Sequence, residues 1–356
     1  MKITGVECWQ QRMEHLEPYT IAYETVSSCT NVFMKIITDS SHVGYGCAAP
    51  DIHVTKEDAK TVIAAFQQFI EPSLKGQDPF TYYRIIESLK PYMRQYPSAL
   101  AMTDMALFDL VAKKAGVPLY KYLGGFRDSI PTSITIGILP LKDTVNKSVD
   151  FVKQGFKVLK IKGGSKVEED IERMIKVREA VGKVVHLRFD ANQGYSVEES
   201  VQFIQHTKEV GIELFEQPTD KKNDELLGKV SARVAVPVMA DESLMTLKDV
   251  FRLAKNDLTD MINIKLMKVG GISEALQINS VAKAAGYESM VGCMDESELG
   301  IAAGLHLALS RPNIQYADLD GHLDLKNDPF AGIIMIKDGI LYPGSSAGLG
   351  MIYRND

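Results

Sequence analysis

Cysteine is scarce in this chain of 356 residues, and its positions follow no metal-binding pattern. Cys8, Cys29, Cys47 and Cys293 form no CxxC pair, and their spacing matches no zinc-site arrangement. These absences exclude a zinc ribbon or finger and a dense disulfide framework. Reduced thiols are typical of a reducing compartment, so we expect a cytoplasmic location.

Long apolar runs and an excess of basic residues are also missing. No stretch approaches the roughly 20 apolar residues of a membrane span, and Met1–Pro18 lacks the apolar region of a secretory signal. Lysine and arginine number 40 against 46 aspartates and glutamates, which gives a net charge of −6. A nucleic-acid partner favours the opposite balance, so we expect neither nucleic acid nor a membrane as partner.

What the chain does contain is a series of strand-like segments that each end in a charged residue. The segments are Val158–Lys162, Leu187–Asp190, Glu213–Glu216, Val238–Asp241 and Ile262–Lys265. Their last residues lie 24 to 28 positions apart, close to the roughly 30 residues of one βαβ unit. This period predicts successive parallel strands, and in a (β/α) barrel the ends of such strands form the functional face.

The residues before and after this repeat follow other patterns of secondary structure. Residues 31–38 and 43–47 read as an antiparallel strand pair, and Met1–Pro18 as a strand followed by a polar loop with Glu14, His15 and Glu17. Helical periodicity marks residues 60–70 and 98–115. An α/β barrel occupies about 250 residues, which leaves roughly 100 for a second unit. We therefore predict an α/β fold: a modified (β/α)7β TIM-like barrel over 126–324, and an α+β capping domain over 1–125 completed by the tail 325–356.

Three carboxylates at the strand ends predict a metal site. Asp190, Glu216 and Asp241 offer hard oxygen ligands, which suit Mg²⁺ with water and substrate completing its shell. Three acids at one barrel mouth would repel one another without a cation. Asn192 could support a ligand through hydrogen bonds, and we expect Glu242 to lie behind the ligands or at the surface.

Three lysines flank the predicted metal site. Lys160 and Lys162 project from the same face of one strand, and Lys265 comes from the other side of the barrel. Like charges and a nearby divalent cation would lower a lysine pKa toward that of a useful base. Such a pair of bases could remove a proton from carbon on one face and return it on the other. We expect Lys268, one helical step beyond Lys265, to be structural.

These motifs resemble those of the enolase superfamily, in its muconate lactonizing subgroup. The residues that carry the resemblance are Lys160-Ile-Lys162, Asp190-Ala-Asn192, Glu216-Gln-Pro218, Asp241-Glu242-Ser243 and Asn263-Ile-Lys265. The resemblance implies Mg²⁺-assisted abstraction of the proton next to a substrate carboxylate, through an enediolate. Within the subgroup, Asp318-Leu-Asp320 resembles the pair with which dipeptide epimerases hold the substrate ammonium group. We therefore expect a dipeptide epimerase that uses Lys162 and Lys265 as bases and Lys160 to stabilise the enediolate.

The resemblance also suggests further contacts with a small dipeptide substrate. The segment after the seventh barrel strand, with Cys293, Asp295 and Glu296, is similar to one that lines the substrate, and Glu296 is expected to hydrogen-bond Lys265. Thr135 on the first barrel strand is a further expected contact. An N-acylamino acid racemase or a cycloisomerase of the same subgroup stays an alternative, as does an inactive barrel kept for metal-dependent binding. Barrels of this kind often assemble, so a homo-oligomer is compatible with the sequence.

Two loops of the cap are expected to determine specificity. Epimerases that act on Ala-Glu resemble this chain but carry an arginine where Glu24 stands, and no lysine or arginine occurs between Arg12 and Lys35. Glu24 and Asp51 would repel an acidic side chain and favour a cationic one. Tyr19, Ile21 and Tyr23 could instead line a pocket for an apolar side chain. The sequence leaves the choice between cationic and hydrophobic open.

Overall fold

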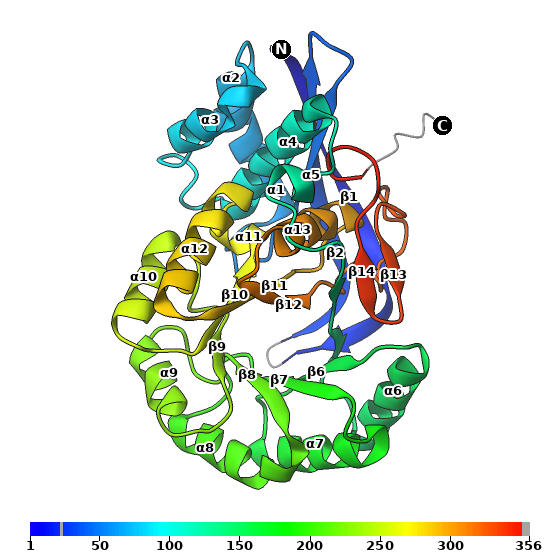
Figure 1. Ribbon diagram of the computed structural model, residues 1–356, viewed down its shortest axis with the longest axis vertical. Coiled ribbons are helices and arrows are strands. Elements are labelled where there is room, and N and C mark those ends of the chain that lie inside the picture. Colours follow the sequence, from blue (N-terminus) through cyan, green and yellow to red (C-terminus); the bar gives the residue numbers. More distant parts are fainter. Residues whose placement is uncertain (22–23, 351–356) are drawn as a thin grey trace.

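The computed structural model describes residues 1–21 and 24–350 and shows a barrel-like body with a cap above it (Figure 1). Eight parallel strands form one sheet in sequential order. A parallel bridge between Thr132 and Ala317 joins the first and last strand regions. The strands are β5 (Ile134–Ile136), β6 (Val158–Lys162), β7 (His186–Asp190), β8 (Ile212–Glu216), β9 (Val238–Ala240), β10 (Met261–Lys265), β11 (Glu288–Gly292) and β12 (Ile314–Asp318).

Helices connect these strands and lie around the outside of the sheet (Figure 1). They are α6 (Leu141–Lys153), α7 (Val167–Val181), α8 (Val197–His206), η3 (Lys208–Val210), α9 (Asp224–Ser231), α10 (Leu247–Lys255), α11 (Leu266–Val269), α12 (Ile272–Ala285) and α13 (Glu298–Ser310). Two of them begin with a capping box, in which Ser196 and Thr246 satisfy backbone amides of the first turn. The expected α/β alternation is confirmed, and it places the carboxyl ends of all eight strands on one face.

The interior of the sheet is filled by side chains rather than solvent. Leu214, Met239, Met261 and Met290 form a small buried cluster of their own, one from each of four strands. A much larger apolar cluster lies between the sheet and its helices. Apolar side chains fill much of the interior, and Lys162, Asp190, Glu216 and Lys265 end their strands at the face where the site is built.

The cap combines an antiparallel sheet with helices. Its strands are β1 (Ile3–Thr20), β2 (Thr25–Thr38) and β3 (Val43–Ala48), and its helical elements are α1 (Ala59–Ala65), η1 (Phe66–Ile70), α2 (Glu71–Leu74), η2 (Pro79–Thr81), α3 (Tyr82–Leu89), α4 (Pro97–Ala115) and α5 (Leu119–Tyr122). The backbone of β3 packs directly on α4: a Cβ atom at Gly46 would lie 1.9 Å from the carbonyl oxygen of Met102. Glycine is therefore required where strand and helix meet.

One expectation for the cap was wrong. The polar stretch Glu14–Glu17 is not a loop, because β1 continues to Thr20 and pairs with β2 along most of its length. The long β1–β2 ribbon carries Tyr19 and His15 down to the mouth of the barrel (Figure 1). Polar side chains in a two-stranded ribbon face both solvent and the barrel, which hides the alternation that marks a half-buried strand.

Tail strands complete the described fold. β13 (Met335–Lys337) pairs with β14 (Ile340–Tyr342), and β14 pairs in turn with β4 (Ile130–Pro131) at the start of the barrel segment. Residues 351–356 of the predicted tail lie outside the described residues, and the limits of the two domains stay a prediction. Across the described parts of the chain, no helix has both the length and the apolar character needed to cross a membrane.

Candidate active site

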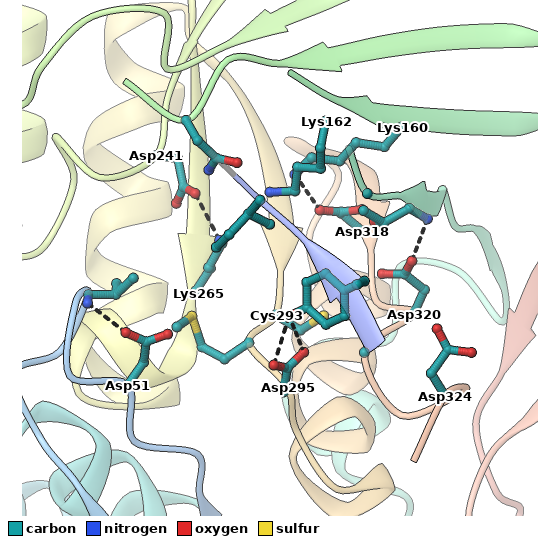
Figure 2. Close-up of a pocket in the computed structure, with 18 of the residues that line it drawn as sticks. Asp51, Lys160, Lys162, Asp241, Lys265, Cys293, Asp295, Asp318, Asp320 and Asp324 are labelled. Atoms are coloured by element: carbon teal, nitrogen blue, oxygen red, sulfur yellow. Dashed lines mark hydrogen bonds and ion pairs between the residues drawn. The ribbon is translucent and has the colours of Figure 1, made fainter. Parts of the chain in front are cut away.

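A pocket lies between the cap and the carboxyl ends of the barrel strands, and it gathers most of the predicted site residues (Figure 2). From the barrel it receives Thr135, Lys160, Lys162, Asp241, Lys265, Cys293, Asp295, Asp318 and Asp320. From the cap it receives His15, Tyr19, Ile21, Asp51 and Val54. Lys160 and Lys162 reach in from one side and Lys265 from another (Figure 2).

The three carboxylates predicted as metal ligands are buried; Asp241 lines this pocket, and Asp190 and Glu216 lie beside the lysines that line it. Each is paired with a lysine: Asp190 with Lys162 at 2.7 Å, Glu216 with Lys160 at 2.7 Å, and Asp241 with Lys265 at 2.8 Å. Burial and the neighbouring carboxylate of Asp190 raise the pKa of Glu216 to about 7, although Lys160 opposes the rise. The lysines outweigh burial at Asp190 and Asp241 and lower the pKa of both, so Glu216 is the ligand that would gain most from additional positive charge.

The pKa values of the lysines differ from expectation. Burial lowers the pKa of Lys160, but the carboxylates of Asp318, Glu216 and Asp190 outweigh burial and raise it well above its usual value. The pKa of Lys265 is also raised, because Asp241 outweighs burial and the charge of Lys160. The predicted lowering is therefore wrong for the protein alone: carboxylates, rather than other ammonium groups, are the nearest neighbours of these lysines.

The chemistry of the donor set fits a hard divalent cation. Within residues 1–21 and 24–350, no three His, Cys, Asp or Glu side chains form a closed set of metal ligands, since the lysines stand between the carboxylates. Yet Glu242 Oε2 is buried and receives no hydrogen bond in the described structure, and Glu216 Oε2 has an ion pair with Lys160 as its described contact. Glu216 Oε1 is fixed by the side-chain amide of Asn263 at 2.9 Å, and the backbone amide of Asn192 donates to Asp190 at 2.9 Å. Such oriented carboxylates are typical of Mg²⁺ sites.

Lys268 and Glu242 are both buried next to the predicted metal ligands. Lys268 is fully buried, and its ammonium group donates to the carboxylate and the backbone carbonyl of Asp241. Glu242 is also buried, contrary to a surface position, and accepts from the Asn192 side chain at 3.4 Å. The only available signal for Lys268 was its apolar surroundings, Leu266, Met267 and Val269, which are unusual for a solvated lysine.

The Asp-x-Asp pair lines the pocket, but its two carboxylates have different surroundings. Asp318 accepts from Lys160 Nζ at 2.8 Å and from the hydroxyl of Ser133 at 2.6 Å. Asp320 accepts from the backbone amide of Thr135 at 2.6 Å, and burial together with Asp318 raises its pKa to about 7. Asp318 therefore has a counterion, whereas Asp320 is a carboxylate that would gain from a cation.

The segment after β11 provides part of the opposite wall. Cys293 and Asp295 line the pocket, and both carboxylate oxygens of Asp295 lie 2.8 Å from the donating hydroxyl of Tyr19. Glu296 is buried and accepts from the backbone amide of Met294 at 2.9 Å, and burial raises its pKa to about 8. The expected hydrogen bond from Lys265 to Glu296 is not formed among the described residues, because the Lys265 ammonium lies against Asp241.

The cap loops close the outer end of the pocket. Asp51 lines it and also holds its own loop, accepting from the backbone amides of His53 and Val54. Glu24 lines an adjoining cavity, with its carboxylate 3.7 Å from His53 Nε2. Tyr23, expected to line an apolar pocket, lies outside the described residues.

Comparison with known proteins gives a consistent picture. Residues 3–124 match the model "Mandelate racemase / muconate lactonizing enzyme, N-terminal domain", and residues 143–356 match "Enolase C-terminal domain-like". An L-Lys-D/L-Arg epimerase from Desulforapulum autotrophicum and a hydrophobic dipeptide epimerase from Enterococcus faecalis are each 39% identical, over 99% of both chains. An N-succinyl-L-Arg/Lys racemase from Bacillus cereus is 30% identical over 92% of this chain and 89% of its own.

Solved structures extend the likeness to three dimensions. The substrate-liganded L-Ala-D/L-Glu epimerase from Bacillus subtilis superimposes with a TM-score of 0.97 at 38% identity, covering 99% of each chain. The Enterococcus faecalis epimerase, complexed with Mg and the dipeptide L-Leu-L-Tyr, superimposes with a TM-score of 0.96 at 39% identity, over 98% of this chain and 99% of its own.

Proposed function

Because this chain belongs to the enolase superfamily, in the mandelate racemase and muconate lactonizing enzyme family, we propose that it is a Mg²⁺-dependent dipeptide epimerase. The reaction converts an L,L-dipeptide into its L,D-epimer by moving the α-proton of the second residue. One observation carries the proposal: two lysines, Lys162 and Lys265, enter one pocket from different strands, and the wall of that pocket bears Asp318 and Asp320.

Asp190, Glu216 and Asp241 would hold the Mg²⁺ ion. Bound there, the ion would attract the substrate carboxylate and stabilise the negative charge that develops on it as the α-proton leaves. The three carboxylates are buried and held by Asn263, the Asn192 backbone and Lys268, so their orientation is set before substrate arrives. Relatives crystallised with Mg and a dipeptide support the choice of Mg²⁺ as the ion.

The lysines perform the proton transfer. Lys162 removes or returns the α-proton on one face of the substrate carbon, and Lys265 does so on the other. Lys160, between Glu216 and Asp318, keeps a positive charge beside the enediolate oxygen. To act as bases, Lys162 and Lys265 must leave their ion pairs with Asp190 and Asp241, which would instead hold the metal.

The remaining carboxylates orient the substrate. Asp320, held by the Thr135 backbone, and Asp318 accept from the N-terminal ammonium group of the dipeptide. Cys293, Asp295 and Glu296 line the substrate, and the second side chain points toward the cap, where Glu24 and Asp51 disfavour an acidic group. A hydrophobic or cationic second residue fits this environment. An N-acylamino acid substrate has no ammonium group for Asp318 and Asp320, and the racemase relative is also less similar than the epimerases.

Two single substitutions, Lys162→Ala and Lys265→Ala, test the proposed mechanism. Each variant should lose epimerisation by a factor of about 10³ or more, because loss of an acid–base group typically costs 10² to 10⁴. Each should retain exchange of the α-proton with D₂O for one stereoisomer, and the two variants should retain it for opposite stereoisomers. Mass spectrometry of dipeptides in D₂O with Mg²⁺ reads both quantities.

The matched control is Lys153→Ala, which removes an exposed lysine from α6. It should exchange both stereoisomers at the wild-type rate. Full activity in both site variants would show that the two-lysine mechanism is wrong. Exchange confined to N-acylamino acids would favour the racemase alternative.

A further inference from the structure

Beneath the cap, the active-site pocket continues into an outer cavity that carries several acids. Its lining is Tyr19, Ile21, Glu24, Val26, Ser28, Cys29, Thr30, Ala49, Pro50, Asp51, Ile52, His53, Met294 and Asp295. Tyr19, Ile21, Asp51, Met294 and Asp295 line the inner pocket as well, so the two spaces adjoin. Three of these described lining residues are carboxylates, and none is lysine or arginine.

The carboxylates of the outer cavity lack a strong counterion. Burial raises the pKa of Glu24, and the nearby carboxylates of Asp51 and Asp295 raise it further. His53 opposes this rise. The four lysines that line the inner pocket already have carboxylate partners: Lys147 pairs with Glu17 at 3.0 Å, and Lys160, Lys162 and Lys265 pair with aspartates of the barrel. An occupant with positive charge would relieve the mutual repulsion of the acids.

A second, independent observation concerns His15, which the proposed mechanism does not use. His15 is only 5% exposed, and it lines the inner pocket. Neither of its ring nitrogens has a hydrogen-bond partner in the described structure. Nε2 lies 3.7 Å from the carboxylate of Asp295, and the ring meets Tyr19 edge-on. A buried polar group without a partner is costly and uncommon, so its presence indicates a polar occupant beside Asp295 rather than an apolar one.

The walls between these polar groups are apolar. Ile21, Val26, Ile52 and Met294 line the outer cavity and could pack against a chain of methylene groups. A side chain with an apolar stem and a charged tip matches this combination. A short side chain would leave the apolar walls uncovered, and an acidic tip would be repelled by Glu24, Asp51 and Asp295.

We propose that the second residue of the dipeptide is lysine or arginine, and that Glu24, Asp51, Asp295 and His15 form the subsite for its charged tip. The inference rests on the proposed epimerase function and narrows its substrate to cationic dipeptides. Glu24 and Asp51 accept from the ammonium or guanidinium group, while Tyr19 holds Asp295 in place. A ring nitrogen of His15 supplies a further polar contact on the inner side.

The test compares substrates that differ only in the charge. L-Ala-L-Lys, L-Ala-L-norleucine and L-Ala-L-Glu are incubated with the full chain and Mg²⁺ in D₂O, and kcat/KM for α-proton exchange is measured. Norleucine has the side chain of lysine without the ammonium group. We expect kcat/KM for the lysine dipeptide to exceed that for norleucine by about tenfold or more, and Glu to exchange most slowly.

Variants then locate the origin of the preference. Glu24→Gln should lower kcat/KM for L-Ala-L-Lys by about tenfold and leave that for L-Ala-L-norleucine within about twofold. Asp295→Asn should act in the same direction. The matched control, Glu198→Gln, removes a carboxylate that is 78% exposed on the outside of the barrel and should change neither value.

Each outcome decides the inference. Preference for lysine that is lost in Glu24→Gln supports it. Equal exchange of lysine and norleucine, or preference for norleucine, overturns the cationic subsite and leaves the epimerase function intact. No exchange with any dipeptide overturns both.

Discussion

Among single residues, Asp241 shows how a predicted metal ligand is held in position. Its two carboxylate oxygens are divided between Lys265 and Lys268. Lys265 faces the pocket and can move away when substrate and metal are present, whereas Lys268 is fully buried and also donates to two backbone carbonyls. Lys268 therefore acts as a fixed counterion that positions Asp241.

This arrangement makes a prediction for Lys268→Met. Removing a buried partner leaves the charge of Asp241 less compensated, which should lower the free energy of unfolding by about 3 kcal/mol without metal. Mg²⁺ then has more negative charge to neutralise, so the rise in Tm on adding Mg²⁺ should be larger than in the wild type. Thermal unfolding with Mg²⁺ and with a chelator measures both effects. Lys153→Met is the control, and equal Mg²⁺-induced shifts in both proteins would contradict the role of Lys268.

The residues that the strand spacing predicted share one property: they end parallel strands. Strand ends meet at one face whatever the details of packing, so Lys162, Asp190, Glu216 and Lys265 were found from spacing alone. Lys268 and His15 could not be placed in this way. Lys268 turns back under Asp241 within a helix of four residues, and His15 reaches the pocket only because β1 bends over the barrel mouth. Both positions depend on tertiary geometry, for which the sequence offers no local signature at His15 and only the apolar neighbours at Lys268.

At the scale of elements, α13 shows how one buried histidine connects separate parts of the chain. His306 is fully buried in this helix, and its Nδ1 accepts from the backbone amide of Tyr120 in α5 at 2.9 Å. Burial lowers the pKa of His306 from 6.5 to about 4. Protonation of Nδ1 would also remove the acceptor for Tyr120, so the packing of α13 on α5 requires the neutral ring.

The pH dependence of stability follows from this shift. Between pH 6.5 and about 4 the unfolded chain binds a proton at this site that the folded chain does not. Stability contributed by neutral His306 is therefore fully present above pH 6.5 and is lost as the pH falls toward 4, by about 3 kcal/mol in total. Urea unfolding at about pH 7 and about pH 5 should show that His306→Gln loses about 2 kcal/mol less than the wild type. His206→Gln, on the surface of α8, should follow the wild type, and superimposable losses in all three proteins would refute the prediction.

For the whole molecule, the cap and the barrel have different parts in the proposed function. The lysines and carboxylates that carry out the proposed chemistry all belong to the barrel, whereas the cap supplies the outer wall with Tyr19, Glu24 and Asp51. The sequence predicted this two-part architecture because the βα repeat is flanked by other patterns of strands and helices. It could not predict how the two parts dock, because the contacts join residues about 270 positions apart, such as Tyr19 and Asp295.

Asn31 connects the cap to the barrel through hydrogen bonds of its side chain. It is buried in β2, and its side chain donates to the carbonyl of Asp295 at 2.9 Å and accepts from the amide of Ser297 at 2.7 Å. Asn31→Leu would leave both backbone groups buried and unpaired, which costs about 1–3 kcal/mol for each. The free energy of unfolding should fall accordingly.

The kinetic effect of the same variant separates cap from barrel. A loosened cap weakens the wall that binds the second side chain but leaves Lys162 and Lys265 in place, so KM for the dipeptide should rise about tenfold while kcat changes less than about threefold. Steady-state epimerisation measures both constants. Asn256→Leu, at the exposed end of α10, should alter neither. If kcat instead fell as much as kcat/KM, the cap would be needed for the chemical step itself, and the outer wall would have to be counted as part of the catalytic site.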